Sequence, residues 1–197
     1  MAEKNFVPGT HDHILLTLGR DLKDKNPKIL VYRDPRRFGI FDYWNGDLKS
    51  LGWGEELAPE PLSQEFNSEY LFSVTRKKTR PIKTLIMDQA KVVGVGNIYA
   101  SESLFFAGLR PTRKSQSLTR VECQDLAKNI KDVLQKAIDS GGSSISDFKT
   151  FYGDSGQYHL QHFVYDREGQ ECRKCHSLIK AKVLSGRSTY WCARCQN

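Results

Sequence analysis

The chain has 197 residues, 39% of them hydrophobic, which is ordinary for a globular protein of one large domain or two small ones. No uninterrupted apolar run is long enough to cross a membrane, and residues 1–5 are not followed by the apolar stretch of a secretory signal. We therefore expect a cytosolic protein with no membrane partner. Thirty Lys and Arg against 23 Asp and Glu give a net charge of +7, which favours a polyanionic partner such as nucleic acid.

The N-terminal part is predicted to form an antiparallel sheet. Residues 14–18, 28–32 and 38–44 are short runs rich in β-branched and aromatic side chains, and Asp34-Pro35 marks a turn before the third run. Residues 45–75 are mixed and rich in turn signals, so we interpret them as a loop-rich link between a β region and a helical region.

Helices are predicted from Pro81 onward. Residues 82–89 form a short helical run with Pro81 at its start, a position that tolerates the missing backbone N–H of proline. Asn97 is a suitable N-cap for a second helix over residues 98–107, which Gly108 would end.

A third, longer helix is predicted after Thr119, which forms a capping box with Glu122. Apolar residues recur behind it at helical spacing until Gly141-Gly142 stops the helix. Cys123 lies on that apolar face, so we interpret it as a buried structural thiol rather than a catalytic one.

Four of the five cysteines form the pattern C-x2-C-x16-C-x2-C, made by Cys172, Cys175, Cys192 and Cys195. Each CxxC aims two thiolates at one ion, and two such pairs give the tetrahedral sulfur coordination that zinc prefers. With four sulfur ligands no coordination position stays open, so the pattern predicts one structural Zn²⁺ rather than a catalytic one. Ordinary buried thiols and a redox CxxC are the alternatives, and the matched spacing disfavours both.

The segment between the cysteine pairs is predicted to be a β-hairpin that turns near Ser185-Gly186. From Cys172 to the end the chain holds no acidic residue and six basic ones: Arg173, Lys174, Lys180, Lys182, Arg187 and Arg194. A rigid basic hairpin suits contacts with phosphate, and the alternative is a merely solvated basic surface.

Residues 87–102 place a glycine-rich turn directly before the helix start at Asn97. Such a turn offers backbone N–H groups and the positive end of the helix dipole to a phosphate, and Lys83 is near enough in sequence to serve the same anion. In the other interpretation the segment is an ordinary helical hairpin, in which Gly94 and Gly96 only supply positive φ. The residues alone leave both open.

The same stretch, with Gly108 and Pro111 after it, resembles the helix-two-turn-helix of bacterial formamidopyrimidine-DNA glycosylases. The cysteine-rich tail resembles the zinc finger of that family. Further similar segments occur in the family's order along the chain: His11-Asp12-His13, Asp34 to Gly39, Gly141 to Phe148 and Val164 to Gly169.

The resemblance implies an α+β fold with three parts. Residues 1–60 would be a partial, truncated remnant of an N-terminal antiparallel β-sandwich domain. Residues 61–160 would be a helical helix-two-turn-helix DNA-binding domain, and residues 161–197 a zinc-finger β-hairpin with four cysteine ligands. We expect the helical and zinc parts to fold without the sheet.

By resemblance the protein acts in base-excision DNA repair. The family excises oxidised purines such as 8-oxoguanine and cuts the strand at the abasic site by β,δ-elimination. The implied partner is double-stranded DNA with a damaged base or abasic site. We expect a monomer, located in the bacterial cytoplasm and associated with the nucleoid when bound to DNA.

The resemblance assigns DNA contacts to seven residues: His11, Arg36, Phe38, Lys77, Lys83, Asn97 and Arg187. Lys83, Asn97 and Arg187 would clamp the phosphates that flank the lesion, and Arg187 would also serve catalysis in the δ-elimination step. Arg36 and Phe38 would fill the gap left by the everted base, because inserted side chains partly restore the lost stacking.

Two departures from the family pattern bear on activity. Residues 152–158 match the segment that covers the flipped base, but they lack the family's Pro-Gly-Tyr-Phe, so the preferred lesion stays open. The family starts Met-Pro-Glu-Leu-Pro-Glu and uses the proline amine as nucleophile, whereas this chain starts Met1-Ala2-Glu3 and meets the His11 motif almost at once.

We therefore expect the catalytic proline and glutamate to be absent, and the 197 residues to bind abasic DNA without cutting it. The first hypothesis is a DNA glycosylase and abasic-site lyase by family, present here as a truncated or mis-started gene product. The alternative is a catalytically dead DNA-binding fragment or one half of a split enzyme. An RNA- or ribosome-associated zinc ribbon is a third reading, which the helix-two-turn-helix and the Arg36/Phe38 pair disfavour.

Overall fold

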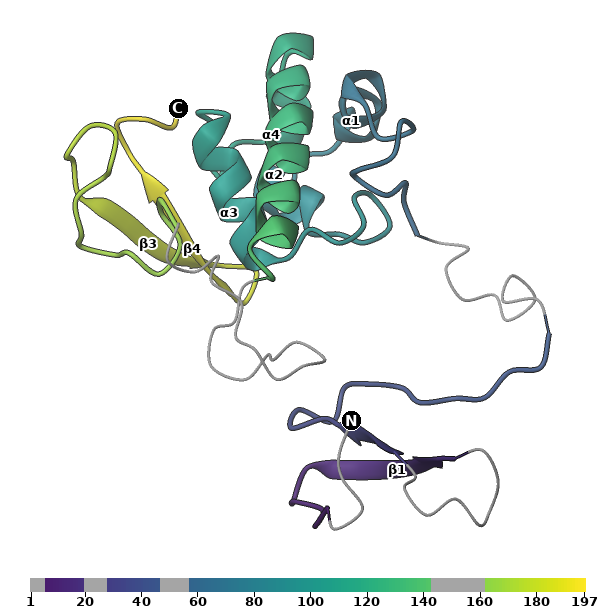
Figure 1. Ribbon diagram of the computed structural model, residues 1–197. Helices are drawn as coiled ribbons and strands as arrows, with labels where there is room; N and C mark the ends of the chain where they lie inside the picture. Colours follow the sequence, from purple (N-terminus) through teal and green to yellow (C-terminus); the bar gives the residue numbers. More distant parts are fainter. Residues whose placement is uncertain (1–5, 20–27, 47–56, 143–161) are drawn as a thin grey trace. The chain divides into compact units, whose positions relative to one another are not determined.

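The structure is a computed structural model that describes residues 6–19, 28–46, 57–142 and 162–197. The chain divides into two compact units, residues 1–51 with 149–154 and residues 52–148 with 155–197. The first unit holds a two-stranded sheet, and the second holds the helices and a second two-stranded sheet (Figure 1). Among the described residues, no helix combines the length and apolar character needed to cross a bilayer.

In the first unit, β1 (Asp12–Leu18) pairs antiparallel with β2 (Lys28–Arg33), and Leu15 lies opposite Val31. An irregularity between Asp12 and Ile14 shifts the register. These two strands confirm the first two predicted runs. One side of the pair forms an open apolar pocket of about 130 Å³, lined by Leu16, Leu30, Val31, Tyr32 and Phe41.

The predicted third strand, residues 38–44, is wrong, because this segment runs as irregular chain. The cause is local. The carboxylate of Asp34 accepts hydrogen bonds from the backbone N–H groups of Arg36, Arg37 and Gly39, at 2.6 to 3.0 Å. Together with the positive φ of Arg37 (56°), these bonds fold the chain into a tight loop after β2.

The second unit contains α1 (Ser68–Thr75), α2 (Ile82–Ile86), α3 (Asn97–Phe106) and α4 (Arg120–Asp139), with a 3₁₀ turn, η2 (Ser115–Ser117). Helix α1 corrects the prediction that residues 45–75 form a loop-rich link. It begins where the side chain of Asn67 accepts a hydrogen bond from Tyr70 N at 3.0 Å, an N-cap that satisfies one free donor of the first turn.

Helices α2 and α3 lie where they were expected, with different ends. Helix α2 stops at Ile86, three residues before the predicted end. Helix α3 already includes Asn97, and Gly96 occupies the N-cap position, so Asn97 is the first helical residue and not the cap. Gly108 follows α3 with φ +68°, as a helix stop of this kind requires.

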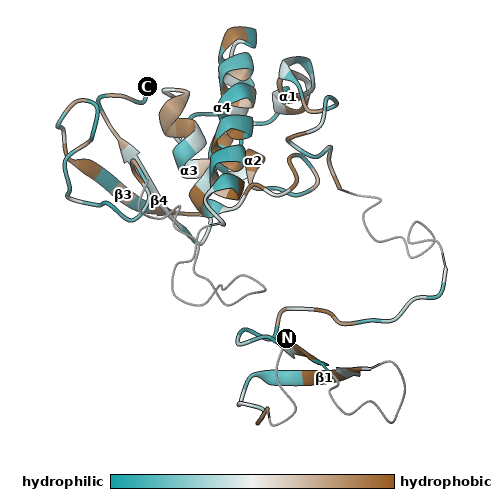
Figure 2. Cartoon of the chain, in the orientation of Figure 1, coloured by the Kyte–Doolittle hydropathy of each residue, from teal (hydrophilic) through white to brown (hydrophobic). Residues whose placement is uncertain are grey.

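Helix α4 confirms the predicted capping box, since Thr119 Oγ1 accepts from Glu122 N (3.2 Å) and the Glu122 carboxylate accepts from Thr119 N (2.8 Å). Hydrophobic and hydrophilic residues alternate along the helix (Figure 2), and its apolar face is buried. Cys123 lies on that face and is fully buried, as predicted. The main core of the unit joins α1 to α4 and includes Phe66, Leu71, Ile82, Leu85, Ile86, Val92, Val95, Leu104, Leu126 and Ile130.

The second sheet is the hairpin of β3 (Ile179–Leu184) and β4 (Arg187–Cys192), with Leu184 opposite Arg187. Ser185 and Gly186 form its turn with φ of +49° and +73°, which confirms the predicted turn position. Strand β4 lies beside α3 (Figure 1), so the hairpin packs against the start of that helix.

Candidate metal centre and nucleic-acid interface

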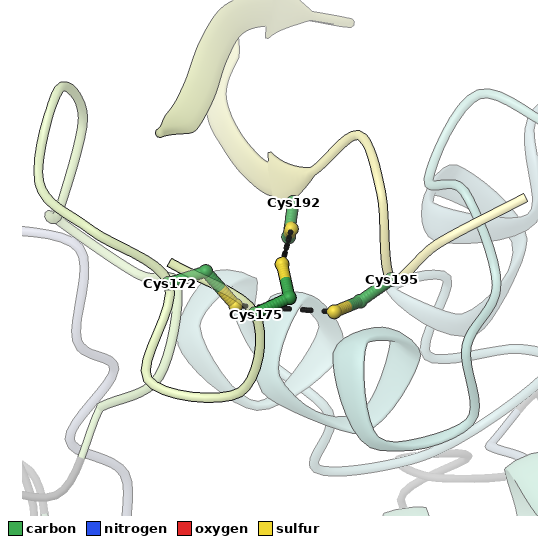
Figure 3. Close-up of side chains that lie close together, drawn as sticks. All are labelled: Cys172, Cys175, Cys192 and Cys195. Carbon is green, nitrogen blue, oxygen red and sulfur yellow. Dashed lines mark hydrogen bonds between the residues drawn. The ribbon is translucent and has the colours of Figure 1, made fainter. Parts of the chain in front are cut away.

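The four cysteines of the tail converge on one point (Figure 3). Their sulfur atoms all lie within 4.8 Å of one another, with 3.9 Å between Cys172 and Cys195 and 3.4 Å between Cys175 and Cys192. Four sulfurs around a tetrahedral zinc at about 2.3 Å lie roughly 3.8 Å apart, so the spacing fits this ion. Because all four ligands come from the chain, the zinc is structural.

Without a metal, the surroundings act in opposite directions on two of these thiols. Burial and the neighbouring thiols raise the pKa of Cys195 to about 12, whereas hydrogen bonds from Ser177 lower the pKa of Cys175 to about 6. Zinc bound at the centre would hold all four groups as thiolates, because the thiolate and not the thiol is the metal ligand.

A buried carboxylate joins the zinc module to α3. Glu102 is fully buried, and its two carboxylate oxygens accept hydrogen bonds from the backbone N–H groups of Phe163, Val164 and Tyr165 at 2.9 to 3.0 Å. Burial raises the pKa of this carboxyl, and the three backbone donors oppose that rise. The segment that leads into the zinc module is therefore fixed to the helix through its main chain.

The end of the chain makes a second connection. The side chain of Gln196, which is fully buried, accepts from Cys192 N at 2.8 Å and donates to the carbonyl of Leu109 at 2.9 Å. The backbone of Asn197 bonds to Gly108 and Arg110, each at 2.9 Å. The zinc module and the loop after α3 thus form one hydrogen-bonded block.

Two of the predicted phosphate-binding residues meet at the start of β4, next to the third. Lys83 Nζ donates to the carbonyl of Ser188 at 3.0 Å and to Thr189 Oγ1 at 2.9 Å. Asn97 Nδ2 donates to the same Ser188 carbonyl at 3.0 Å, and Arg187 is the exposed residue just before it. Helices α2 and α3 therefore each supply one side chain to the Ser188 carbonyl, and Arg187 precedes that residue in the hairpin.

Lys83 is an unusual cation, because only 1% of its surface is exposed. Burial lowers the pKa of its ammonium group from 10.5 to about 7. Among the described residues no carboxylate forms an ion pair with it, so its charge is held by two neutral oxygens. Nearby, the Oδ1 atom of Asn97 is buried and accepts no hydrogen bond from any described residue.

The glycine-rich turn before α3 is partly closed by the protein itself. Gly94 has φ +74°, and its N–H donates to Gln89 Oε1 at 2.8 Å. At Gly96 the backbone faces open space, because a Cβ atom added to this residue would have no atom within 4 Å apart from its chain neighbours.

The other predicted contact residues lie elsewhere. His11, Arg36 and Phe38 belong to the first unit, where His11 O accepts from Asp34 N at 3.0 Å and Phe38 is 85% exposed at the Asp34 loop. Lys77 belongs to the second unit, between α1 and α2, and is exposed with φ +55°. The lesion-covering segment, residues 152–158, falls outside the described residues.

Sequence reasoning missed Glu102 and Thr189, which are both fully buried. For Glu102 a signal was present, because a carboxylate stands inside the apolar run of α3. For Thr189 there was none, since threonine is common in strands and only the fold brings Lys83 to it.

Comparison with known proteins gives these contacts a context. Residues 57–149 match the family described as the formamidopyrimidine-DNA glycosylase H2TH domain, and residues 169–197 match the zinc finger found in FPG and IleRS. A formamidopyrimidine-DNA glycosylase of Bdellovibrio bacteriovorus is 46% identical over 193 residues, which are 96% of this chain and 69% of the relative. One from Haemophilus influenzae is 43% identical over all of this chain and 70% of the relative.

Solved structures of formamidopyrimidine-DNA glycosylases also match this chain. The MutM (Fpg) protein of Thermus thermophilus matches with a TM-score of 0.84 at 36% identity, over 96% of this chain and 70% of that one. Lactococcus lactis Fpg in complex with DNA containing an abasic site matches with a TM-score of 0.87 at 30% identity, over 99% and 69%. The chain thus spans about two thirds of the length of these relatives, and it belongs to the formamidopyrimidine-DNA glycosylase family.

Proposed function

We propose that this chain is a base-excision repair protein that grips duplex DNA at a damaged base or an abasic site. The meeting of Lys83 and Asn97 at the Ser188 carbonyl carries the proposal, because it lies directly next to the exposed Arg187 in the chain. Related proteins have been solved with DNA that contains an abasic site or a Fapy-dG lesion. Binding to damaged chromosomal DNA would place the protein at the nucleoid.

In this proposal Lys83, Asn97 and Arg187 hold backbone phosphates beside the lesion. Arg187 is the exposed member, free to reach DNA and to serve the δ-elimination step. The buried ammonium of Lys83 lacks a counter-charge among the described residues, and a phosphate would supply it. The zinc acts only indirectly, by fixing the hairpin that carries Arg187.

His11, Arg36, Phe38 and Lys77 complete the proposed DNA contacts. The high exposure of Phe38 suits an aromatic wedge, because a side chain that enters a base stack must stand clear of its own core. The tight loop around Asp34 presents it beside Arg36. The reaction that we propose for the protein is excision of oxidised purines, such as 8-oxoguanine, followed by strand cleavage with β,δ-elimination.

The second candidate is DNA binding without catalysis, by this chain alone or as half of a split enzyme. The contacts at Ser188 are compatible with it, because a lysine and an amide side chain beside the DNA backbone serve binding without any chemical step. Borohydride trapping on an 8-oxoguanine duplex separates the two. Binding of the 197 residues to an abasic duplex without a trapped adduct would support the second candidate, and a covalent adduct would support the first.

The clamp has its own test, the salt dependence of binding to an abasic-site duplex. Lys83→Ala and Arg187→Ala should each weaken binding and lower the slope of log K against log salt by about 0.9, one phosphate each. The matched control is Lys128→Ala, which removes an exposed lysine from α4. Slopes equal to the wild-type value in both clamp variants would remove Lys83 and Arg187 from the proposed interface.

A further inference from the structure

A single buried hydroxyl links two of the clamp residues. Thr189 is fully buried in β4, and its Oγ1 accepts a hydrogen bond from Lys83 Nζ at 2.9 Å. The same Oγ1 donates to the backbone carbonyl of Arg187 at 3.1 Å. One oxygen thus connects the ammonium group of α2 to the main chain that carries the exposed guanidinium at the tip of the hairpin.

We propose that Thr189 is a positioning residue that sets Lys83 and Arg187 at a fixed distance so that both can act on the DNA backbone. The inference rests on the proposed function, because it assumes that these two residues bind phosphate. It goes beyond that function because it names a group that does not contact DNA itself. This group couples two phosphate-binding residues, Lys83 on α2 and Arg187 on β4.

The residue type suits this task. A hydroxyl is both donor and acceptor, so it can accept from Lys83 and donate to Arg187 at once. Threonine is branched at Cβ and therefore stiff about χ1, so the direction of its hydroxyl is fixed by the strand. Valine has the same shape without the hydroxyl, and serine keeps the hydroxyl without the branch, which makes the two substitutions a clean pair.

The absence of charge on Thr189 matters as much as its geometry. A carboxylate at this position would bind the Lys83 ammonium more strongly, but it would also neutralise the cation and repel a phosphate. A hydroxyl and the Ser188 carbonyl are neutral, so they hold Nζ in place without compensating its positive charge. Thr189 therefore fixes the cation without competing with the anion that the cation is proposed to bind.

The test is binding of the zinc-loaded 197-residue chain to an abasic-site duplex. Thr189→Val removes both hydrogen bonds of the hydroxyl and should weaken binding roughly three- to tenfold, and Thr189→Ser should restore most of it. The matched control is Thr84→Val on α2, because the hydroxyl of Thr84 donates to the carbonyl of Pro81 and not to Lys83. Thr84→Val should bind as the wild type does.

A double-mutant cycle shows whether Thr189 acts through Lys83. In a Lys83→Ala background, Thr189→Val should cause little further loss, because the link between Lys83 and Arg187 is already broken. Normal affinity of Thr189→Val, or an equal loss in both backgrounds, would overturn the inference alone. Normal affinity of Lys83→Ala would overturn the proposed clamp together with it, so the two failures are distinguishable.

A measurement on the free protein covers the case in which Thr189→Val does not fold. Lys83→Met keeps an apolar stem and removes the ammonium group. If Thr189 links Lys83 to the Arg187 carbonyl, this variant should shift the Thr189 methyl resonance and the Ser188 amide nitrogen, which follows that carbonyl in the chain. Thr84→Val should leave both resonances in place. Unmoved resonances in Lys83→Met would overturn the inference.

Discussion

At the scale of single residues, the protonation state of Lys83 affects both the stability of the fold and the proposed binding of DNA. Its side chain is only 1% exposed and its ammonium sits against neutral oxygens, so its pKa falls to about 7. The unfolded chain keeps a pKa near 10.5. Between these values the unfolded state holds a proton that the folded state has released, and below about pH 7 both states are charged.

This linkage predicts opposite pH effects on folding and on binding. As pH rises from about 7 to about 9, the free energy of unfolding should increase by up to about 1.4 kcal/mol per pH unit relative to Lys83→Met. DNA affinity should fall over the same range, because a phosphate prefers the charged amine. Urea titrations and fluorescence anisotropy with an abasic duplex measure the two quantities. Parallel profiles for wild type and Lys83→Met would contradict the prediction.

At the scale of elements, hydrogen bonds to the backbone hold the zinc module against α3. Glu102 takes three backbone N–H groups from residues 163–165 through two oxygens. Gln196 and Asn197 add bonds to residues 108–110. Because these contacts involve the main chain, they fix the path of the segment and not merely the position of one side chain.

Glu102→Gln should therefore destabilise the second unit. The amide nitrogen would face the N–H of Phe163, donor against donor, while the remaining oxygen could still serve Val164 and Tyr165. Relief of the buried charge offsets part of this loss, and we expect about 1–3 kcal/mol in urea unfolding. The control is Glu69→Gln, an exposed partner of Arg120, for which less than about 1 kcal/mol is expected. Equal effects of the two variants would count against the role of Glu102.

The elements that the sequence predicts correctly are those with local signals. The zinc site and hairpin turn followed from spacing, and α4 from the Thr119 capping box. Helix α1 was missed because it is only 8 residues long and its one sequence signal is the N-cap residue Asn67. Glu102 bonds to residues 61 to 63 positions away, and Lys83 meets Thr189 across 106 positions. Only the fold creates such contacts, so no local pattern could reveal them.

At the scale of the whole molecule, the two units differ in how much apolar surface they bury. The second unit joins the helices and the zinc hairpin in one body with its own core. The first unit is a two-stranded sheet with exposed apolar side chains, among them Leu15, Leu18, Ile40 and Trp44. A sheet of two strands is marginally stable by itself. The third strand failed as a prediction because strand propensity at residues 38–44 does not reveal the loop that the Asp34 carboxylate forms just before them.

Removal of zinc should therefore act on the second unit and on DNA binding together. We expect one zinc per chain by elemental analysis, and Cys175→Ala should lose it. The hairpin would then no longer hold Ser188 and Thr189 against Lys83, so affinity for an abasic duplex should fall more than about tenfold, or about 1.4 kcal/mol. Cys123→Ala, which removes the buried thiol of α4, should keep the metal and the binding. Full binding by the metal-free chain would contradict this dependence.

Because Lys83 is buried, its chemical modification can report how often the hairpin separates from α2. An amine-reactive acylating reagent cannot reach a nitrogen that is covered by β4, although exposed lysines of the same chain react at once. Acylation of Lys83 therefore waits for the hairpin to lift from α2. When reclosing is fast compared with the reagent, the acylation rate read by peptide mass spectrometry gives the free energy of that local opening, and bound DNA should slow it.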